Sequence, residues 1–236
     1  DDTRMYSCAI FTKPESSLHE ASITKIDRIC NKLNLSPADH LLEIGTGWGG
    51  FALHAAKHYG CRVTSTTISK EQFVFTENLI KENGLQDKVT ILKKDFRQLD
   101  GQFDKLVSIE MIEAVGYKLY KTFFQKCSQL LKPEGLLVIQ AITITDNLFE
   151  ESKDFIDFIK QYIFPGSCIP SITSLCNAAT SSDIKLFHLE DITPHYARTL
   201  KEWRINFLKN NKQVKDLGFT NAFIRMWLFY LCYCEG

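Results

Sequence analysis

Two glutamates stand where an apolar run of the sequence ends, a position from which carboxylates could act on a bound ligand. The stretch SIEMIEAVG, from Ser108 to Gly116, contains them as Glu110 and Glu113. No cluster of histidines or cysteines adjoins them, so the pattern does not predict a metal site. Their chemistry therefore depends on the site that the neighbouring elements build.

A glycine-rich turn is the clearest sign of such a site. Glu43 is followed by Gly45 and Gly47, which lie between a short apolar run and a helical pattern. Without a Cβ, the backbone can pass close beneath a ligand and turn into the helix. The alternative is an ordinary strand-to-helix turn, but the first such unit of an alternating α/β chain is where these folds bind ligands.

The turn does not match a nicotinamide dinucleotide site. Such a site has the pattern G-x-G-x-x-G and an acid about 20 residues later. This chain has G-x-G-x-G, and residues 65–68 read STTI, without an acid. The acid instead precedes the glycines, as Glu43. This arrangement resembles motif I of the S-adenosylmethionine-dependent methyltransferases.

The elements that must position these residues alternate between strands and helices. Apolar strand patterns begin at His40, Cys61, Lys88, Phe103 and Leu136, and helical spacing covers the segments after most of them and residues 17–35. Gly84 is expected to cap one helix, and Lys132-Pro133 to stop another. This alternation predicts a parallel sheet with helices on both faces.

The regular alternation of strand and helix patterns ends at about Thr145. Residues 147–182 are rich in aromatic side chains and are expected to form an insertion over the carboxyl edge of the sheet. A helix is predicted at 171–180, a strand at 184–191 and helices at 197–211 and 221–234. Because the chain stops within a helical pattern, we expect it to be part of a longer protein.

Composition narrows the class of protein. Lysine plus arginine equal aspartate plus glutamate at 28 each, so the formal net charge is zero. This balance argues against a nucleic-acid-binding protein, which normally carries an excess of positive charge. The eight cysteines include no C-x-x-C pair, which argues against structural zinc and favours a reducing, cytoplasmic compartment. No apolar run approaches the length of a membrane span.

Several further motifs occur together along the chain. They are MYSCAIF (5–11), LLEIGTGWGGFALHAA (41–56), TISKEQ (67–72), FDKLVSIEMIEAVG (103–116), LKPEGLLVIQAITI (131–144), YIFPGSCIPS (162–171) and PHYARTLKEW (194–203). Together they resemble the cyclopropane-fatty-acyl-phospholipid synthases and the related mycolic acid cyclopropane synthases.

The resemblance implies a Rossmann-like class I methyltransferase: an α/β fold whose mixed, mostly parallel sheet has helices on both faces and a helical insertion over the active site. It also implies one catalytic domain over residues 1–236. Its parts would be an N-terminal helical cofactor lid (1–36), the core (37–146), a substrate-covering insertion (147–182) and a C-terminal strand and helices (183–236).

The cofactor implied by the resemblance is S-adenosyl-L-methionine. Tyr6 and Ser7 would close over it, with Gly45 and Gly47 beneath. The other cofactor residues would be Glu43, Thr67, Ile68, Gln72, Asp95, Phe96 and Ile109. The amide of Gln72 could replace the missing acid at the ribose. On residue type alone, Ile68, Phe96 and Ile109 could equally be core residues, and Asp95 a solvated loop residue.

The family is understood to methylate an alkene and to close a cyclopropane ring with a bound bicarbonate ion as the base. By resemblance, the contacts of that ion map onto Cys8, Glu113, Tyr196 and Gln140. The backbone N–H near Cys8 and the Tyr196 hydroxyl would donate to it, and ionised Glu113 would accept its O–H. Glu110 is interpreted as structural or solvated.

Two departures from the family pattern concern ring closure. Gln140 and Ala114 stand where many members have histidine. A neutral amide can donate a hydrogen bond but cannot be protonated as histidine can. The replacements could weaken bicarbonate binding or give a product that is methylated without a ring.

The expected substrate is the acyl chain of an unsaturated phospholipid, met at a transient membrane surface by an enzyme peripheral to the inner face. Aromatic and aliphatic residues could line its path, although core packing is the alternative: Phe149, Phe155, Phe158, Ile159, Tyr162, Ile163 and Phe164, with Phe223, Met226, Trp227 and Phe229. Five basic residues could meet anionic headgroups: Lys153, Lys160, Arg198, Lys201 and Arg204.

Three functions stay open: a cyclopropane synthase, a lipid or small-molecule methyltransferase without ring closure, and a non-catalytic cofactor-binding domain.

Overall fold

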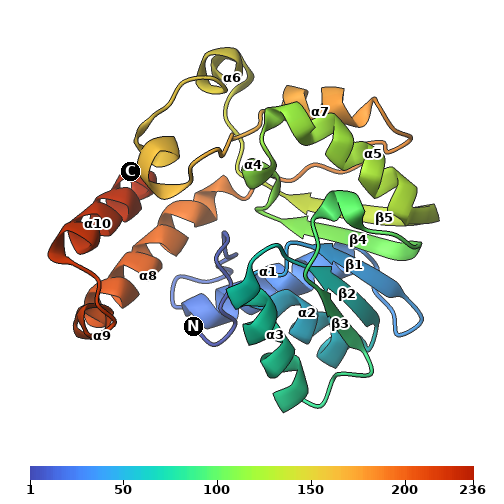
Figure 1. Cartoon of the computed structure of the whole chain (residues 1–236), viewed down its shortest axis with the longest axis horizontal. Coiled ribbons are helices and arrows are strands. Elements are labelled where there is room, and N and C mark those ends of the chain that lie inside the picture. Colours follow the sequence, from blue (N-terminus) through green and yellow to red (C-terminus); the bar gives the residue numbers. More distant parts are fainter. The chain divides into compact units, whose positions relative to one another are not determined.

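Five parallel strands form one sheet in the order β3-β2-β1-β4-β5 (Figure 1). The structure is a computed structural model that describes residues 1–236. The strands are β1 (His40–Ile44), β2 (Arg62–Thr66), β3 (Val89–Leu92), β4 (Phe103–Ile109) and β5 (Leu131–Gln140). Every neighbouring pair is parallel. The predicted α/β fold class is therefore confirmed.

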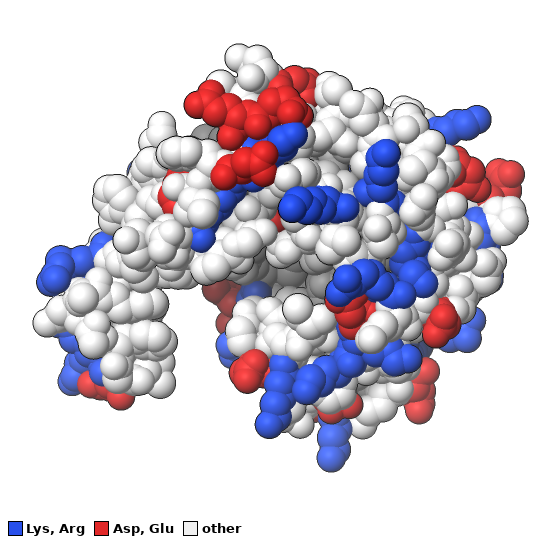
Figure 2. All heavy atoms as spheres, turned by 45° about the horizontal axis from the view of Figure 1, so that its top comes forward, with Lys and Arg blue, Asp and Glu red and all other residues white.

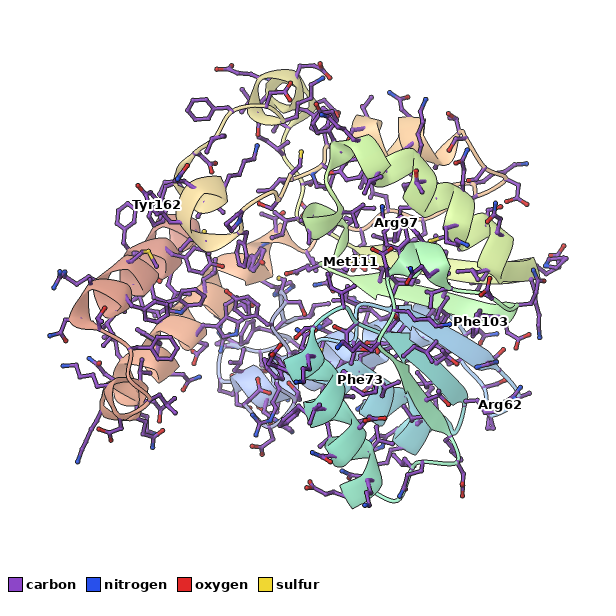
Figure 3. All side chains as sticks on the ribbon, viewed as in Figure 1. Arg62, Phe73, Arg97, Phe103, Met111 and Tyr162 are labelled. Carbon is purple, nitrogen blue, oxygen red and sulfur yellow. The ribbon has the colours of Figure 1, made fainter.

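The strand order changes direction between β1 and β4. The chain builds outward from β1 to β3 and then returns to place β4 on the other side of β1. Ligands of open parallel sheets bind outside the carboxyl ends of the strands at such a switch point. Met111 lies at that edge, whereas Phe103 and Arg62, the first residues of β4 and β2, lie at the opposite edge (Figure 3).

Successive side chains of β1 are buried on opposite faces of the sheet. Leu41 packs in a core with α1 (Leu18–Lys32), α2 (Gly50–His54) and α3 (Lys70–Glu82). Leu42 packs in a second core on the other face, with residues of two further helices. These are α5 (Tyr120–Leu130) and α7 (Ile172–Ala179). Because successive side chains of a strand point to opposite faces of the sheet, β1 contributes to the core on each face. Helices cover both faces, as the sequence predicted.

Local signals set several helix ends. Ser69 caps α3 by accepting a hydrogen bond from the backbone N–H of Gln72, and Gly84 follows that helix with φ +66°. Ser171 and Ser174 form a capping box at the start of α7. The short elements are the π-helix η1 (Ala55–Tyr59), η2 (Phe96–Gln98), α4 (Ile112–Val115), η3 (Tyr117–Leu119), α6 (Asp146–Ser152) and η4 (Ile159–Ile163).

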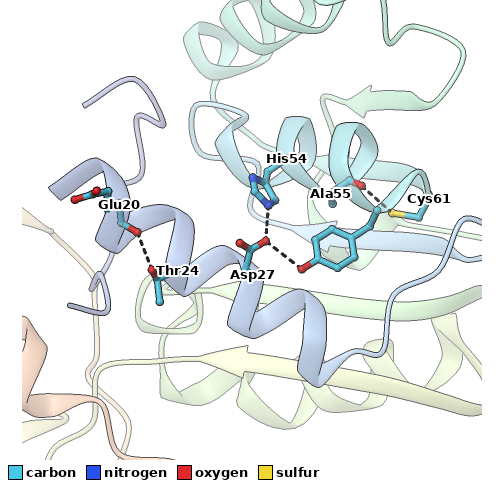
Figure 4. A network of polar contacts seen from close by, with 7 residues as sticks. Glu20, Thr24, Asp27, His54, Ala55 and Cys61 are labelled. Carbon is cyan, nitrogen blue, oxygen red and sulfur yellow. Dashed lines mark hydrogen bonds and ion pairs between the residues drawn. The ribbon is translucent and has the colours of Figure 1, made fainter. Parts of the chain in front are cut away.

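One carboxylate joins α1 to the helix that follows the glycine turn. Asp27 Oδ1 contacts His54 Nε2 at 2.7 Å and accepts the Tyr59 hydroxyl at 3.0 Å (Figure 4). Burial lowers the pKa of His54, so at neutral pH its ring is uncharged and donates to Asp27. This contact holds α1 against the first βα unit.

The chain divides into two compact units. The larger, called the core unit below, comprises residues 2–7 and 26–188 and contains the whole sheet. The smaller, called the helical unit, comprises Asp1 and residues 8–25 and 189–236. Its elements after residue 189 are η5 (Thr193–His195), α8 (Tyr196–Lys209), α9 (Asn211–Asp216) and α10 (Asn221–Glu235). Arg204 of α8 pairs with Glu235 of α10 at 2.7 Å and joins these two helices.

The predicted strand at 184–191 is wrong. These residues form neither helix nor strand, and no strand pairs with them. Leu186 and Phe187 are exposed, at 60% and 76%. An alternating apolar pattern is a weak predictor of a strand, because tertiary context decides the pairing, and residues 184–191 pair with neither edge strand of the sheet, β3 or β5.

Candidate cofactor and reaction site

The glycine turn leaves open space where a ligand would lie. Backbone N–H groups of Gly45 and Thr46 donate to the Thr66 carbonyl at the end of β2, at 3.1 and 2.9 Å. A Cβ on Gly45 (φ +103°) would lie 3.0 Å from Met111 Cγ, so a side chain there would press on Met111 and would be strained at this φ. A Cβ on Gly47 (φ +54°) would meet nothing within 4 Å. The turn is therefore packed on one side and open on the other.

The N-terminal residues of the core unit lie against this turn. A Cβ on Gly50 would lie 2.1 Å from the Thr3 carbonyl oxygen, so only glycine allows the N-terminal segment to pass there. The Arg4 guanidinium lies 4.7 Å from the centre of the Phe75 ring on α3. Tyr6 is 45% exposed and Ser7 is buried. Gly50 was not among the predicted site residues, although the Gly49-Gly50 pair in the sequence signals a close backbone approach.

Glu43 is buried at the end of β1 and belongs to a short polar chain. Ser65 Oγ on β2 donates to Glu43 Oε2 at 2.5 Å, and Thr46 Oγ1 lies 2.5 Å from the same Ser65 oxygen. These contacts tie the carboxylate to the glycine turn and to the neighbouring strand. The sequence predicted Glu43 but not Ser65 or Thr46, because the register that brings them together is tertiary.

The structure orients the Gln72 amide. Thr67 Oγ1 accepts the Ser69 N–H at 3.1 Å and donates to Gln72 Oε1 at 2.7 Å. The Gln72 Nε2 group has no hydrogen-bond partner within the protein and is left as a donor beyond the end of β2. This geometry fits the predicted role of Gln72 as a neutral donor to a ligand hydroxyl.

The four residues whose type left two interpretations open fall into three groups. Ile68 is 75% exposed, so the core-packing alternative is wrong for it. Phe96 packs edge-on against Phe123 at 5.6 Å, and Ile109 packs against the core that contains Leu41. Asp95 accepts two hydrogen bonds from the Arg97 guanidinium, both at 2.9 Å, which lowers its pKa.

Glu113 has an asymmetric carboxyl environment. It lies in α4, directly after the carboxyl end of β4, and is buried. Oε1 accepts the Ile142 backbone N–H at 2.6 Å, whereas Oε2 is buried without a hydrogen-bond partner. Its carbonyl oxygen accepts the Cys168 N–H at 2.8 Å, and Tyr120 donates to the Cys168 carbonyl at 2.7 Å. The backbone is thus anchored while one carboxyl oxygen is left for a ligand.

Burial raises the pKa of Glu113 to about 7, and the nearby Glu110 carboxylate acts in the same direction. The Ile142 N–H opposes this shift by stabilising the ionised form. A carboxyl group with this pKa can be either protonated or ionised at neutral pH. It can therefore donate to, or accept from, a ligand that itself carries a proton.

Gln140 is held by Glu110. Its Nε2 donates to Glu110 Oε1 at 2.8 Å, and the Glu110 backbone N–H donates to the Gln140 carbonyl at 2.7 Å. Glu110 has φ +46°, an uncommon conformation for glutamate. Of the two interpretations of Glu110, these contacts fit the structural one. Ala114, which replaces a histidine of many family members, is exposed.

The two other predicted catalytic residues belong to the helical unit. Cys8 is buried, with Sγ 3.4 Å from the Ala9 carbonyl oxygen. Tyr196 begins α8, and its ring meets Trp203 edge-on at 6.4 Å. The backbone N–H of Ala9 donates to Thr199 Oγ1 on α8 at 3.1 Å, which places the segment after Cys8 beside the helix of Tyr196. The structure thus brings Glu113 and Gln140 together in one unit, and the segments of Cys8 and Tyr196 together in the other.

The insertion exposes much of its apolar surface. Phe155, Tyr162 and Phe164 are 64%, 61% and 39% exposed, so core packing does not explain them. Phe149 alone among the predicted aromatic residues of this segment is buried. Acidic side chains gather on the surface over α6, with basic side chains among them (Figure 2).

Four of the five basic residues predicted to meet headgroups have partners inside the protein. Lys153 pairs with Glu150 at 2.5 Å, and Lys160 donates to backbone carbonyls of residues 152–155. Arg198 donates to three carbonyls of residues 13–16, and Arg204 pairs with Glu235. Lys201 is exposed. No helix has both the length and the apolar character that crossing a bilayer requires.

The sheet order and the glycine turn after β1 are those of the class I, Rossmann-like methyltransferase fold. The family model described as mycolic acid cyclopropane synthetase matches residues 1–236. The chain belongs to this family, and the resemblance seen in its motifs is confirmed.

Individual relatives support the same family assignment. The tuberculostearic acid methyltransferase UfaA1 of Mycobacterium tuberculosis is 37% identical over 244 residues, which cover 100% of this chain and 57% of that protein. The cyclopropane-fatty-acyl-phospholipid synthase of Escherichia coli K12 is 36% identical over 239 residues, covering 100% and 59%. The chain therefore spans less than two thirds of these curated relatives. The crystal structure of mycolic acid cyclopropane synthase CmaA1 complexed with SAH and CTAB matches with a TM-score of 0.92 at 30% identity, covering 100% of this chain and 85% of that one.

Proposed function

We propose that the whole protein transfers a one-carbon group from S-adenosylmethionine to the double bond of an unsaturated phospholipid acyl chain and closes a cyclopropane ring. The observation that carries the proposal is the buried carboxyl of Glu113, with one oxygen unpartnered, at the carboxyl edge of a methyltransferase sheet. Gly45 and Met111 are in contact range, so the glycine turn and the segment leading to Glu113 adjoin.

The residues present fit the cofactor. Gly47 leaves open space above the turn, Ile68 offers an exposed apolar surface, and Gln72 presents an amide donor. Bound there, S-adenosylmethionine would supply an electrophilic methyl group. Transfer of that methyl group to the double bond would leave a carbocation on the substrate. Tyr6 and Ser7 would cover the cofactor and help to exclude water, which would otherwise trap that cation.

Ring closure requires the loss of a proton from the added methyl group. We assign Glu113 to hold the base, a bicarbonate ion, through its unpartnered Oε2. Burial places the pKa of Glu113 near 7, so like-charge repulsion can be relieved by sharing the proton between carboxyl group and ion. Within the core unit, Gln140 would add a further contact to the ion.

Methylation without ring closure is the second candidate function. The observation that favours it is the hydrogen bond from Gln140 to Glu110, which takes one N–H of the amide away from an ion at Glu113. If the proton leaves another carbon, the product gains the same atoms but keeps a double bond. One curated relative is named a methyltransferase and the other a cyclopropane synthase, so both outcomes occur among similar proteins.

The acyl chain is proposed as substrate because of the exposed apolar residues of the insertion. Phe155, Tyr162 and Phe164 offer apolar area of the kind that binds lipid chains. We propose that the protein meets this substrate at the inner face of a membrane, bound transiently and peripherally. Most of the basic residues first considered have internal partners, so the apolar surface rather than those charges supports the proposal.

The test uses the full-length protein, labelled S-adenosylmethionine and vesicles of dioleoyl phosphatidylglycerol, with and without bicarbonate. A product that has gained one carbon and lost its olefin, formed faster with bicarbonate, is expected. A product that has gained the carbon and kept an olefin would support the second candidate. No transfer by the full-length protein would leave a non-catalytic cofactor-binding domain.

A further inference from the structure

The N-terminal segment, residues 3–7, and the helix α3 both lie against the glycine turn. A Cβ on Gly50 would lie 2.1 Å from the Thr3 carbonyl oxygen. A Cβ on Gly49 would lie 2.6 Å from Cγ2 of Thr76 on α3. Either added carbon would collide with its neighbour, so the chain has glycine where each segment approaches the turn. The two segments therefore border the same few residues of the turn.

One aromatic ring joins all three segments. The Arg4 guanidinium of the N-terminal segment lies 4.7 Å from the centre of the Phe75 ring on α3. The same ring meets Trp48 of the glycine turn edge-on, with the ring centres 5.5 Å apart. A guanidinium at this distance is attracted to the negative face of an aromatic ring. Phe75 lies one helical turn after Gln72, the proposed donor to the cofactor, so this contact adjoins the cofactor site.

The backbone at Arg4 bends sharply. Its φ of +52° lies in the left-handed region, which is uncommon for a residue with a Cβ and persists where neighbouring contacts hold it. The Met5 N–H donates to Thr3 Oγ1 at 3.3 Å, and the Met5 side chain packs against the core that contains Leu41. Thr3 and Met5 thus fix the backbone on either side of the bend, and Arg4 adds the side-chain contact with α3.

We propose that the Arg4–Phe75 contact holds the N-terminal segment closed over the cofactor and sets the rate at which the cofactor enters and leaves the site. The proposal rests on the proposed function, in which Tyr6 and Ser7 of this segment cover S-adenosylmethionine. Each methyl transfer leaves S-adenosylhomocysteine, which must depart before the next cofactor binds, so the segment must open once in each turnover. Because Arg4 acts through the segment, it is a positioning residue.

The two rates of cofactor exchange distinguish this role from a general effect on the pocket. A covered site releases and admits its ligand only while the cover is open, and loss of a contact made in the closed form increases the open fraction. Both release and entry then become faster, and the affinity falls by no more than the release rate rises. A distorted pocket would instead release the ligand faster and bind it more slowly.

Variants of the full-length protein test the proposal. R4M keeps the length of the side chain but removes its charge, and R4K keeps a charge. F75L keeps an apolar residue but removes the ring, and R4M/F75L combines the two changes. K118M is the matched control, because Lys118 is also exposed and lies over an aromatic ring, 5.8 Å from the centre of Tyr117, but in η3.

Three measurements are made without lipid. Release of labelled S-adenosylmethionine into excess unlabelled S-adenosylhomocysteine gives the release rate. Calorimetric titration with S-adenosylmethionine gives the affinity, and the release rate divided by the dissociation constant gives the entry rate. Hydrogen exchange of the backbone amides of residues 5–7, followed by mass spectrometry, reports the opening of the segment in the free protein.

R4M should release the cofactor about fivefold faster, the order of effect of one partly exposed cation–π contact. Its entry rate should be no slower than that of the wild type, and its amides at residues 5–7 should exchange faster. R4K and K118M should behave as the wild type. R4M should have no further effect in the F75L background, because the ring that Arg4 contacts is then absent.

Unchanged release by R4M, or amide exchange at residues 5–7 equal to that of the wild type, would overturn the proposal. Faster release with slower entry would show a distorted pocket and would also reject it, as would additive effects of R4M and F75L. If the wild type binds S-adenosylmethionine but transfers no carbon to lipid, only the proposed function fails, and the release rates still decide the role of Arg4. If it binds no S-adenosylmethionine, both fail.

Discussion

Ile142 holds one oxygen of Glu113, by a backbone hydrogen bond of 2.6 Å, while the other oxygen of that carboxyl group is buried without a partner. Leaving a buried polar atom unpaired is costly, and such atoms call for an explanation in a native structure. A ligand that carries both donors and acceptors would satisfy it. The relationship therefore defines the position of the proposed base more closely than residue type alone.

The substitution E113Q should abolish the proposed chemistry while preserving the fold. Glutamine keeps an oxygen to accept the Ile142 N–H but cannot share a proton with the base. We expect transfer to lipid to fall at least about 100-fold, a typical contribution of a group that handles a proton. Labelled transfer to vesicles measures this effect, and calorimetric titration with S-adenosylhomocysteine should show unchanged affinity. Full activity of the variant would remove Glu113 from the mechanism.

Stability should depend on pH through Glu113. Because burial raises its pKa from 4.5 to about 7, the folded state holds its proton more tightly than the unfolded state. This contribution is fully present below pH 4.5 and is lost as pH rises through 7, by about 3 kcal/mol in total. Urea unfolding of wild type and E113Q from pH 4.5 to 8 should show the wild type losing stability relative to the variant. A difference that grows with pH in favour of the wild type would contradict the assignment.

The open space above Gly47 should be functional. Alanine at this position would place a methyl group where no protein atom lies within 4 Å, and so in the path of a ligand. G84A is the matched control, since Gly84 is also left-handed with nothing near its Cβ position. Both variants should lose about 1 kcal/mol of folding stability, because a side chain is strained at positive φ. Only G47A should bind S-adenosylhomocysteine more weakly, and equal affinities in the two variants would show that Gly47 lies outside the cofactor site.

The Thr67–Gln72 hydrogen bond should contribute to cofactor affinity. Q72A removes the donor, and T67V removes the hydroxyl that orients it. We expect Q72A to weaken binding of S-adenosylhomocysteine about tenfold, as loss of one well-placed hydrogen bond does, and T67V to weaken it less. Q86A, at an exposed glutamine between α3 and β3, is the control. Calorimetric titration gives the affinities, and wild-type binding by Q72A would reject the assignment.

Much of the site followed from sequence because it lies at strand ends. Gly45 and Gly47 turn away from β1, and Glu113 follows β4, so a parallel sheet necessarily carries them to the same edge. Ser65 and Gly50 were missed because their roles depend on neighbours distant in sequence, Glu43 across the sheet and Thr3 in the N-terminal segment.

The wrongly predicted strand at 184–191 and the contacts of Glu110 both show what residue type and pattern cannot predict. Alternating apolar residues predict a strand, but whether the segment pairs with an edge strand is decided only in the assembled fold, and residues 184–191 pair with neither β3 nor β5. The sequence left Glu110 as structural or solvated, because neither its left-handed backbone nor its hydrogen bond to Gln140 can be derived from residue type.

The sequence by itself determined the family, the parallel α/β core and the set of residues that could handle a cofactor and a proton, because these depend on local periodicity and on motifs. Only the tertiary structure decided the states of those residues. Burial set the pKa of Glu113, the register of β4 and β5 joined Glu110 to Gln140, and the open side of the turn distinguished Gly47 from Gly45. These properties depend on solvent exclusion and on contacts between distant segments, which exist only once the chain has folded.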